Sequence, residues 1–462
     1  MGHIYPPMTS LRDVRPSWVC VAAWLAVASG WACSSAQPEA NGGTSIGTTG
    51  GGGGSSRTGG ASGAGKGGAG GDTDGGSGAA GDDADAAGGP SGGDLDGGGS
   101  ADGPEGDVDD GGAPGGSGPT HARMIALDTT AAGAGVMGDV PKYPVAVILT
   151  DASFDFSQAK AKGEDIRFAT VDGTPLPYAI ESWDSAAKVA AVWVKVDVKG
   201  NSTQMIKMTW GDAGASDASD SHTVFDTKEG FVGVWHLNEP GSAAKDTYKD
   251  ATGNLADGTG PEMTADATGD GRIGKAVLLS HAKFQSIQIP LERGPLFDHP
   301  DQMTYSVWAF AKTHTVDYQC MLSKGEGSFR IHYVGPSTTV ETCLESGAGD
   351  DLCPVNSKGT KVVPGKWFHL LAVHAHPRHA IYVNGVLQIS VNDNVPWQSD
   401  PTKPVSIGNN STFLAKTATS RSFDGLLDEA RVMAVPKDDN WIKLEYESQR
   451  EGQKFLTFGA GS

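Results

Sequence analysis

Oxygen-bearing side chains gather in one acidic stretch of the sequence, at Asp246, Asp250, Asn254 and Asp257. Ca²⁺ prefers hard oxygen ligands from carboxylates, amides and carbonyls, and a polar loop supplies them. This stretch is therefore the best candidate in the sequence for a Ca²⁺ site. The alternative is that these Asp and Asn side chains accept hydrogen bonds from their own backbone in turns.

Two aromatic residues in polar loops are candidates for ligand binding. Trp397 follows Pro396, and Tyr248 lies within the acidic stretch. An exposed aromatic ring stacks on a sugar ring, while neighbouring carboxylates or amides bind the hydroxyl groups. The alternative for Trp397 is a lid over the core. Trp183 and Trp193 offer the same stacking chemistry, although such residues more often pack in a core.

The sequence shows no pattern of catalytic carboxylates. Retaining hydrolysis of a glycosidic bond needs two carboxylates about 5 Å apart. The pattern Glu-x-Asp-x-x-Glu, which places such carboxylates on one face of a strand, does not occur in the sequence. Asp428 and Glu429 are adjacent, so along a regular strand they point to opposite faces and do not form such a pair. The motifs of serine hydrolases, zinc peptidases and phosphate-binding loops are also absent. We therefore expect a protein that is not an enzyme. The alternative is an enzyme whose active site is assembled from distant loops.

Two further groups combine chemistry with a plain structural alternative. His374, His376 and His379 suit a transition metal, but no Cys, Asp or Glu lies near them in sequence, which favours a solvated turn. Asp165 and Arg167 share one face of a predicted strand. They pair with each other or with a ligand, and an exposed pair contributes little to stability.

The clearest β pattern runs from Gly365 to Ser390. Apolar residues occupy both faces of residues 367–373, which predicts a core strand between two layers. Residues 381–383 then lead into Asn384-Gly385, the pair that best tolerates the two positive φ angles of a type I′ turn. With the apolar residues that follow, the pattern predicts a β-hairpin.

This hairpin, with Trp-x-His-Leu from Trp367 and Ile-Tyr-Val-Asn-Gly from Ile381, resembles the central hairpin of laminin-G-like jelly rolls. These belong to the concanavalin A-like lectin/glucanase superfamily. Further blocks resemble the same family in the same order, namely residues 233–238, 250–254, 274–277, 287–290, 304–308 and 423–432. The resemblance implies an antiparallel β-sandwich, and many family members bind calcium at a rim. Residues 440–446 after these blocks predict a short helix.

An earlier region resembles a bacterial family known only as a domain of unknown function. The resemblance rests on Tyr-Pro-Val-Ala-Val from Tyr143, Asp-Ile-Arg-Phe from Asp165, Glu-Ser-Trp from Glu181 and Trp-Gly-Asp from Trp210. Members of that family recur beside laminin-G-like modules and in some TolQ/ExbB-type transport proteins. This resemblance implies an accompanying β-rich domain and supplies no chemistry.

The 462 residues include 67 glycines, so part of the chain cannot build a packed core. We expect a signal peptide at residues 1–33, because two arginines precede a short apolar run. Its end resembles a bacterial lipobox with Cys33 as the acylated residue, and ordinary cleavage is the alternative. Residues 34–119 form a disordered linker rich in Gly, Ser and Asp. The β-rich domain then covers residues 130–215, and the jelly roll covers residues 225–460.

Export permits disulfide bonds, and three cysteines lie in the part of the chain expected to fold. We favour a bond between Cys343 and Cys353, which closes a short loop rich in Gly, Ser and Asp. Cys320 then remains as a buried thiol. The other two pairings stay open at the level of sequence.

Taken together, these features predict an all-β protein with two β-sandwich domains after a disordered tether. The expected function is non-catalytic binding of a carbohydrate or an envelope protein at the cell surface. The alternatives are a carbohydrate-active enzyme and a structural or transport-accessory envelope protein. A net charge of −20 argues against nucleic acid as a partner. We expect contact with the membrane through a lipid anchor alone, and a location in the outer membrane or outside the cell.

Overall fold

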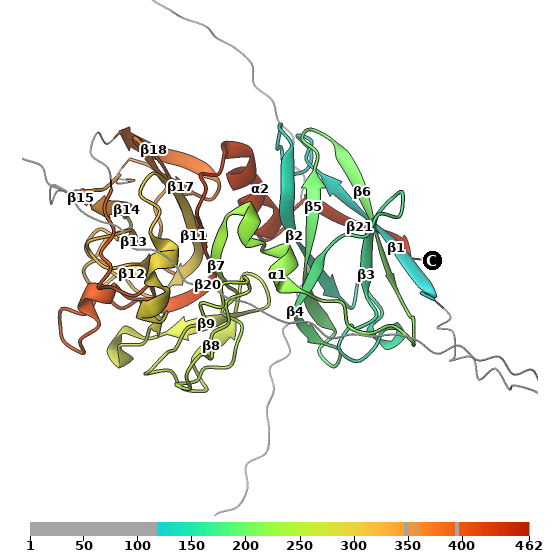
Figure 1. The fold of residues 1–462 in the computed structure, drawn as a ribbon, viewed down its shortest axis with the longest axis horizontal. Coiled ribbons are helices and arrows are strands. Elements are labelled where there is room, and N and C mark those ends of the chain that lie inside the picture. The colour runs from blue at the N-terminus through green and yellow to red at the C-terminus, as the bar shows by residue number, and fades with distance from the viewer. Residues whose placement is uncertain (1–117, 346–350, 355, 357, 393–396, 462) are drawn as a thin grey trace, which may run out of the picture. The chain divides into compact units, whose positions relative to one another are not determined.

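The computed structural model describes residues 118–345, 351–354, 356, 358–392 and 397–461, and its regular structure is almost all β (Figure 1). This confirms the predicted all-β fold class. The predicted signal peptide, Cys33 and nearly all of the predicted linker lie outside the described residues. In the described part of the chain, no helix is long and apolar enough to cross a membrane.

The first unit contains two antiparallel sheets that share one core. Its strands are β1 His121–Asp128, β2 Val140–Thr150, β3 Arg167–Thr170, β4 Tyr178–Asp184, β5 Val189–Val198, β6 Thr203–Trp210 and β21 Leu456–Gly461. One sheet has the order β2-β5-β4, and the other has the order β21-β1-β6-β3. The middle strand β5 is rich in β-branched residues, and its Val192, Val194 and Val196 are buried.

The predicted domain boundaries differ from this arrangement at both ends. Strand β1 begins at His121, before the predicted start at residue 130. The last strand, β21, pairs with β1 and not with the jelly roll, as Leu127 opposite Leu456 shows. The sequence placed this segment in the second domain because its local pattern contains no information about which distant strand it pairs with.

The second unit also contains two antiparallel sheets. Its strands are β7 Phe231–Trp235, β8 Thr268–Asp270, β9 Lys275–Leu279, β10 Ile287–Gln288, β11 Gln302–Ala311, β12 Cys320–Ser323, β13 Arg330–Tyr333, β14 Val340–Glu345, β15 Asp351–Leu352, β16 Trp367–Ala375, β17 Arg378–Val383, β18 Val386–Asn392, β19 Ser406–Ile407 and β20 Gly425–Met433. The six-stranded sheet has the order β10-β19-β12-β13-β14-β15. The eight-stranded sheet has the order β18-β17-β16-β11-β20-β9-β8, with β7 beside β20.

Strand β16 is the core strand that the sequence predicted. It lies between β11 and β17 in the larger sheet, and the side chains from Phe368 to Val373 are buried. The predicted hairpin turn is also present, because Asn384 and Gly385 have φ angles of 53° and 71°. Two consecutive positive φ angles are the requirement of a type I′ turn.

In the described part of the chain, two α-helices and five short 3-10 helices accompany the strands. They are α1 Ser221–Val224, α2 Asp439–Gln449, η1 Phe156–Gln158, η2 Thr227–Glu229, η3 His281–Lys283, η4 Leu291–Phe297 and η5 Ser411–Phe413. Helix α2 covers the predicted helix at residues 440–446. Its N-cap is Asp438, whose side chain accepts a hydrogen bond from the backbone N–H of Trp441.

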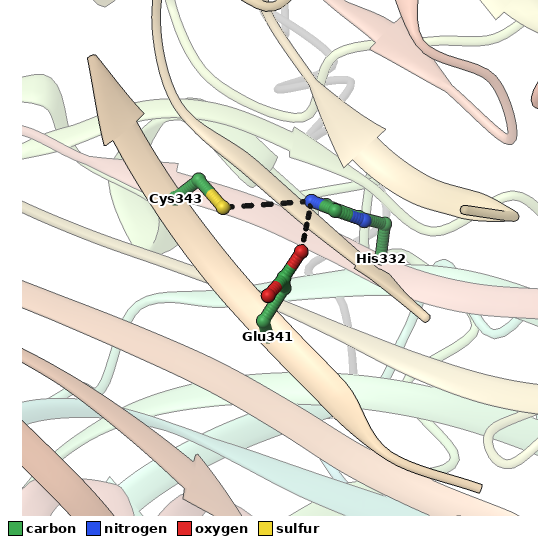
Figure 2. Close-up of side chains that lie close together, drawn as sticks. All are labelled: His332, Glu341 and Cys343. Carbon is green, nitrogen blue, oxygen red and sulfur yellow. Dashed lines mark hydrogen bonds and ion pairs between the residues drawn. The ribbon is translucent and has the colours of Figure 1, made fainter. Parts of the chain in front are cut away.

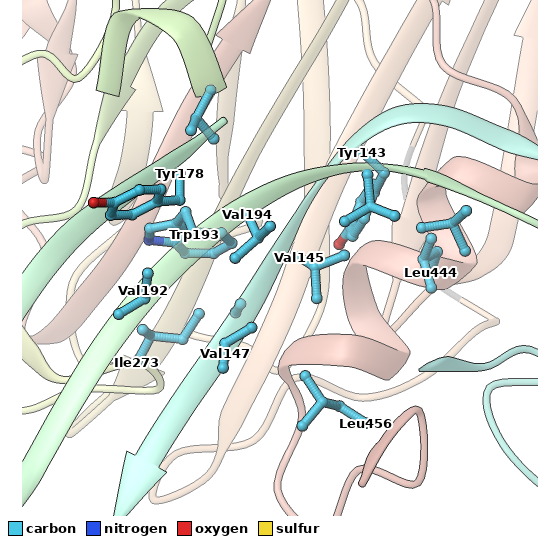
Figure 3. Close-up of a cluster of buried hydrophobic side chains, with 14 of the residues drawn as sticks. Tyr143, Val145, Val147, Tyr178, Val192, Trp193, Val194, Ile273, Leu444 and Leu456 are labelled. Atoms are coloured by element: carbon cyan, nitrogen blue, oxygen red, sulfur yellow. The ribbon is translucent and has the colours of Figure 1, made fainter. Parts of the chain in front are cut away.

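The larger sheet contributes to two hydrophobic cores. One face packs on the six-stranded sheet through residues such as Tyr305 and Leu370. Leu371 and Tyr382, on the other face, belong to the same cluster as Val145 and Trp193 of the first unit and Leu444 of α2. Figure 3 shows Val145, Trp193 and Leu444 within this cluster. This second core, which we call the shared core, therefore joins the two units through side chains of both.

Candidate ligand-binding pocket beside helix α2

A pocket of about 430 Å³ opens where four distant segments meet, and we call it the α2 pocket. Strand β11 provides Trp308 and Phe310, and the turn into β16 provides Gly365, Lys366 and Trp367. Helix α2 and the residues after it provide Tyr446, Arg450 and Glu451. The turn between β8 and β9 provides Arg272. The paired strands β11 and β16 fix the floor, because Phe310 lies directly opposite Trp367 in their register.

Four aromatic rings line the α2 pocket. The rings of Phe310 and Trp367 are tilted against each other with centroids 5.7 Å apart. Trp308 is buried and stacks on Tyr446 at 5.8 Å. Phe310, Trp367 and Tyr446 are each partly exposed, so they offer ring surface to a ligand. Such a surface packs well against the apolar C–H groups of a ligand ring.

Three cations surround these rings. Arg272 donates from Nε to the carbonyl of Gln449, and its guanidinium lies 5.6 Å from the centroid of the Trp308 ring. Arg450 donates from Nε to Glu447 at 2.6 Å, and this hydrogen bond raises the pKa of the guanidinium. Lys366 is exposed in the turn before β16. The pocket thus combines aromatic surface with hydrogen-bond donors, which is the usual composition of a small-molecule site.

A buried group of charges lies in the same region, between the two units. His236 lies 2.8 Å from Glu429 and 3.6 Å from Glu181, both measured from Nδ1 to a carboxylate oxygen. Glu181 comes from β4 of the first unit, whereas Glu429 comes from β20. Burial raises the pKa of Glu181 to about 7. Burial disfavours the charged form of His236, but Glu429 and Glu181 together raise its pKa.

Arg431 connects this group to helix α2. It donates to Glu429 at 2.7 Å and to Glu445 at 3.2 Å, and all three side chains are buried. Burial also raises the pKa of Glu445 to about 7. These residues hold the two units and α2 together, and neither Glu429 nor Glu445 lines the α2 pocket.

The regular strand that was assumed for Asp428 and Glu429 is interrupted. The register between β11 and β20 shifts at this point, and Glu429 has a φ angle of 50°, so the strand is bulged instead of regular. Both carboxylates interact electrostatically with Glu181. Asp428 accepts hydrogen bonds from the backbone N–H groups of Arg272 and Ile273 and so positions the turn that lines the α2 pocket.

The acidic stretch predicted to bind Ca²⁺ forms local hydrogen bonds. Asp250 is buried and accepts from the backbone N–H groups of Val234, Thr252 and Ala256. Asp257 pairs with Lys249 at 2.7 Å, Asn254 donates to the Val232 carbonyl, and Asp246 lies 3.5 Å from Lys245. Among the described residues, the two possible metal-binding groups of His, Cys, Asp and Glu lie elsewhere. Calcium binding at this stretch therefore stays a prediction.

The predicted ligand-binding aromatics are core residues. Trp397 is 2% exposed and Tyr248 is 0% exposed, and both belong to the core between the two sheets of the second unit. A stacking platform must present a ring face, so this prediction is corrected for both residues. Of the other two candidates, Trp193 is buried, whereas Trp183 is partly exposed and lines a second pocket.

That second pocket, of about 610 Å³, lies between strands β4 and β5 and two loops of the second unit, and we call it the β4 pocket. Its charged lining is mostly acidic, with Glu181, Asp184, Glu239 and Asp270 against Lys275. Lys275 already pairs with Asp270 at 2.7 Å. The two pockets therefore differ in the sign of the charge that they present.

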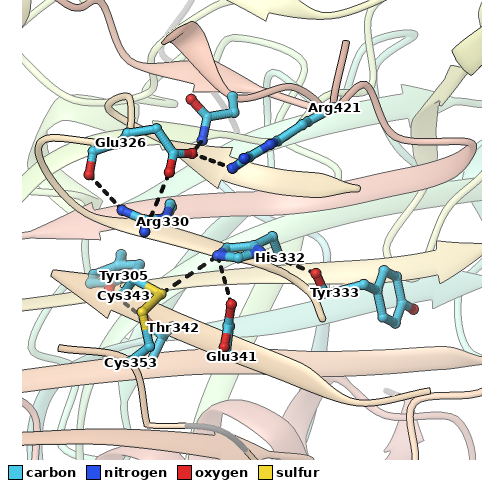
Figure 4. Close-up of a disulfide and its surroundings, with 11 residues drawn as sticks. Tyr305, Glu326, Arg330, His332, Tyr333, Glu341, Thr342, Cys343, Cys353 and Arg421 are labelled. Atoms are coloured by element: carbon cyan, nitrogen blue, oxygen red, sulfur yellow. Dashed lines mark hydrogen bonds and ion pairs between the residues drawn. A yellow bond between two sulfur atoms is a disulfide. The ribbon is translucent and has the colours of Figure 1, made fainter. Parts of the chain in front are cut away.

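The predicted disulfide between Cys343 and Cys353 is present (Figure 4). Cys320 is a buried free thiol. His332 lies beside the disulfide, with Nε2 3.6 Å from the Cys343 sulfur and 3.4 Å from Glu341 (Figure 2). Burial lowers the pKa of His332 to about 3, so the imidazole is neutral at ordinary pH. Because the sulfur of Cys343 is already bonded, this group is structural.

The remaining sequence candidates also have structural contacts. His374 and His379 are buried, with ring centroids 5.8 Å apart, so they do not form a solvated turn. Asp165 accepts from the backbone N–H groups of Lys160 and Gly211. Arg167 donates to the Tyr178 hydroxyl and to backbone carbonyls, not to Asp165.

Sequence reasoning did not find the α2 pocket as a site. It named Trp367 only as part of a strand, and it did not single out Lys366, Arg272 or Arg450. The one local signal is the Lys-Trp pair at the start of a predicted core strand, where an aromatic ring and a cation lie at a strand end. The other pocket residues come from segments far apart in the chain.

Two family models match the chain. Residues 162–238 match the domain of unknown function DUF2341, and residues 282–443 match the concanavalin A-like lectin/glucanases superfamily. This is the predicted order, so both resemblances are confirmed, and the second unit has a lectin-like jelly-roll fold. No curated protein matches the chain.

Three solved structures illustrate the structural similarity. The binding domain of Paraclostridial Mosquitocidal Protein 1 has a TM-score of 0.37 and 14% identity, over 48% of this chain and 53% of that one. Domain 4 of AbnA, a GH43 extracellular arabinanase from Geobacillus stearothermophilus in complex with arabinotriose, has a TM-score of 0.34 and 19% identity, over 46% of this chain and 97% of that one. The receptor binding domain of botulinum neurotoxin mosaic serotype C/D has a TM-score of 0.36 and 13% identity, over 48% of this chain and 52% of that one. This chain thus spans about half of the first and third, and similarity at this level assigns no function.

Proposed function

We propose that this protein is a non-catalytic saccharide-binding protein of the cell envelope and that the α2 pocket holds the sugar. The observation that carries the proposal is the partly exposed ring surface of Phe310, Trp367 and Tyr446 beside hydrogen-bond donors in one pocket. The volume of about 430 Å³ falls in the usual range for small-molecule sites. The lectin-like fold of the second unit supports a binding role.

The chemistry of the pocket suits a sugar ring. Trp367 and Phe310 present apolar faces to the C–H groups of the sugar, and burial of this area drives association. Lys366 and Arg450 present N–H donors to hydroxyl or carboxylate oxygens. The floor is fixed by paired strands, so little conformational entropy is lost on binding.

A carbohydrate-active enzyme has less support. Its reaction needs two carboxylates that reach the sugar, whereas the α2 pocket is lined by one, Glu451. Asp428 and Glu429 are buried and act inside the contact between the two units. A structural envelope component is the outcome if no saccharide binds.

The proposal is tested by binding the full chain to an array of neutral and acidic oligosaccharides. Retention of at least one glycan is expected, and Trp367→Ala should weaken it by about tenfold or more, because the stacking surface is lost. The matched control is Tyr318→Ala, which removes an exposed ring that does not line this pocket. Circular dichroism confirms that both variants fold. Absence of retention, or equal retention by Trp367→Ala, would contradict the proposal.

Two further proposals rest on sequence and carry their own tests. Calcium at Asp246, Asp250, Asn254 and Asp257 should raise the melting temperature relative to EDTA, and identical midpoints would end that idea. Acylation of Cys33 should appear as fatty-acyl mass on the mature chain from a membrane fraction. Release of a Cys33→Ser variant from that fraction is the expected counterpart.

A further inference from the structure

The charges that line the α2 pocket are unusual for this protein. The chain carries a net charge of −20, so its overall field repels anions. Nevertheless, among the residues that the structure describes, the pocket is lined by Arg272, Lys366 and Arg450 against the single carboxylate of Glu451. A cluster of cations beside exposed aromatic rings therefore needs a specific reason.

The internal contacts of the protein account for only part of this positive charge. Arg450 pairs with Glu447 and also lies just after helix α2, where the helix dipole favours a cation. Arg272 is held by the Gln449 carbonyl and the Trp308 ring, and the nearest Glu451 oxygen is 3.9 Å from its Nη1. Because the Glu451 side chain is almost fully exposed, an ion pair at 3.9 Å neutralises little of the charge of Arg272.

Lys366 is the clearest case. It is exposed at the mouth of the pocket, directly before Trp367 in the chain. Its side chain therefore begins next to the ring surface that we assign to the sugar. The turn Gly365-Lys366 ends at strand β16, whose pairing with β11 fixes the position of this end.

We propose that the ligand of the α2 pocket is an acidic saccharide, with a carboxylate or sulfate group held by Lys366, Arg272 and Arg450 while the sugar ring packs on Trp367 and Phe310. This inference rests on the proposed saccharide binding and names the class of sugar. Arg272 offers Nη1 and Nη2 as paired donors to a carboxylate or sulfate, because its Nε donates to Gln449. Arg450 offers Nη2, because its Nε donates to Glu447 and its Nη1 to the carbonyls of Glu451 and Gly452. The lysine adds a mobile point charge. The β4 pocket, with its acidic lining, presents the opposite charge and is not suited to this ligand.

The test uses matched glycans that differ only in the acidic group. A uronic acid oligosaccharide, its methyl ester and a sulfated counterpart of the same neutral backbone are titrated into the full chain by calorimetry. The acidic members should bind at least about tenfold more tightly than the ester. Comparison of the affinities for the uronate and for the sulfated glycan shows which of the two anionic groups the pocket prefers. Affinity for the acidic members should fall as salt rises from about 0.05 to 0.5 M, since the pocket is open to solvent.

Variants separate this inference from the proposed function. Lys366→Gln should weaken binding of the acidic glycan about fivefold and leave the ester unchanged, and Lys366→Glu should weaken it further. Trp367→Ala should weaken both. The matched control is Lys207→Gln, which removes an exposed cation on β6 outside the pocket. Equal binding of acid and ester, or no effect of Lys366→Glu, would overturn the inference while leaving saccharide binding intact. No binding of any member would overturn both.

Discussion

At the scale of single residues, Arg431 is a buried charge at the contact between the two units. It is fully buried, pairs with Glu429 and Glu445, and lies 4.7 Å from the centroid of the Trp193 ring. A buried charge of this kind is tolerated only with its partners, because each ion has lost its hydration. The partners in turn depend on Arg431.

Substitution of this residue should therefore be severe. We expect Arg431→Met to lower the free energy of unfolding by about 3–5 kcal/mol, since the buried carboxylates lose their cation. Urea denaturation followed by tryptophan fluorescence measures this change. Lys207→Met, at an exposed position, is the control and should change stability by less than about 0.5 kcal/mol. A small effect of Arg431→Met would show that the carboxylates become protonated at little cost.

His379 gives a prediction of pH dependence. Burial, together with His374, lowers its pKa to about 3, below the value near 6.5 of an unfolded histidine. As pH falls, the unfolded chain takes up this proton first, so the stability from neutral His379 is complete above about pH 6.5 and is lost toward pH 3. His379→Leu should flatten the fall in melting temperature over this range. His222→Leu, at an exposed histidine, should leave the curve unchanged.

Single residues also show why sequence found some contacts and missed others. Cys343 and Cys353 are ten residues apart, so their pairing followed from local spacing. Trp397 looked exposed because its neighbours are polar, yet the ring packs into the core. Local polarity does not report which way a side chain turns. The α2 pocket could not be predicted, because Arg272 and Tyr446 meet Trp367 only through the fold.

At the scale of elements, the clearest surprise is strand β21. It leaves the second unit after α2 and pairs with β1 of the first, and the buried Phe455 and Leu456 place its start in the shared core. The β17–β18 hairpin was predicted well, because its apolar pattern and Asn-Gly turn are local. The pairing of β21 is non-local, and its sequence has no comparable signal.

Removal of β21 should therefore destabilise the whole fold, with the greatest local opening around β1, its pairing partner. We expect a chain that ends at Gln453 to lose at least about 4 kcal/mol of stability, because two buried apolar side chains are removed and β1 becomes an edge strand. Limited proteolysis should then cut first near β1 and β2. Protection of β1 equal to that of the intact chain would contradict this prediction. A Thr457→Ser variant, which keeps the strand, is the control.

At the scale of the whole molecule, the shared core makes the two units one cooperative body. It contains Val145 and Trp193 from the first unit, Leu371 and Tyr382 from the second, and Ile442 from α2. The sequence predicted two domains in the correct order but treated them as separate. Apolar residues on the outer face of a strand give the same sequence pattern whether they pack on a partner domain or on a second sheet.

We therefore expect the residues from β1 to β21 to unfold in one thermal transition. Calorimetry should give equal calorimetric and van't Hoff enthalpies for the full chain. Leu371→Ala, which removes a side chain of the second unit from the shared core, should shift that single transition downward by at least about 2 kcal/mol in stability. Two separate transitions would show that the units fold independently.

The pairing of β21 with β1 also determines how the protein bears force. A pull on the segment before His121 enters the fold at β1, which lies between β21 and β6 in its sheet. Hydrogen bonds on both sides of β1 are then loaded together in shear, instead of being peeled apart one by one from an edge. A pull along β1 would thus be resisted by a strand that is hydrogen-bonded on both edges, to β6 on one side and to β21, the last strand of the fold, on the other.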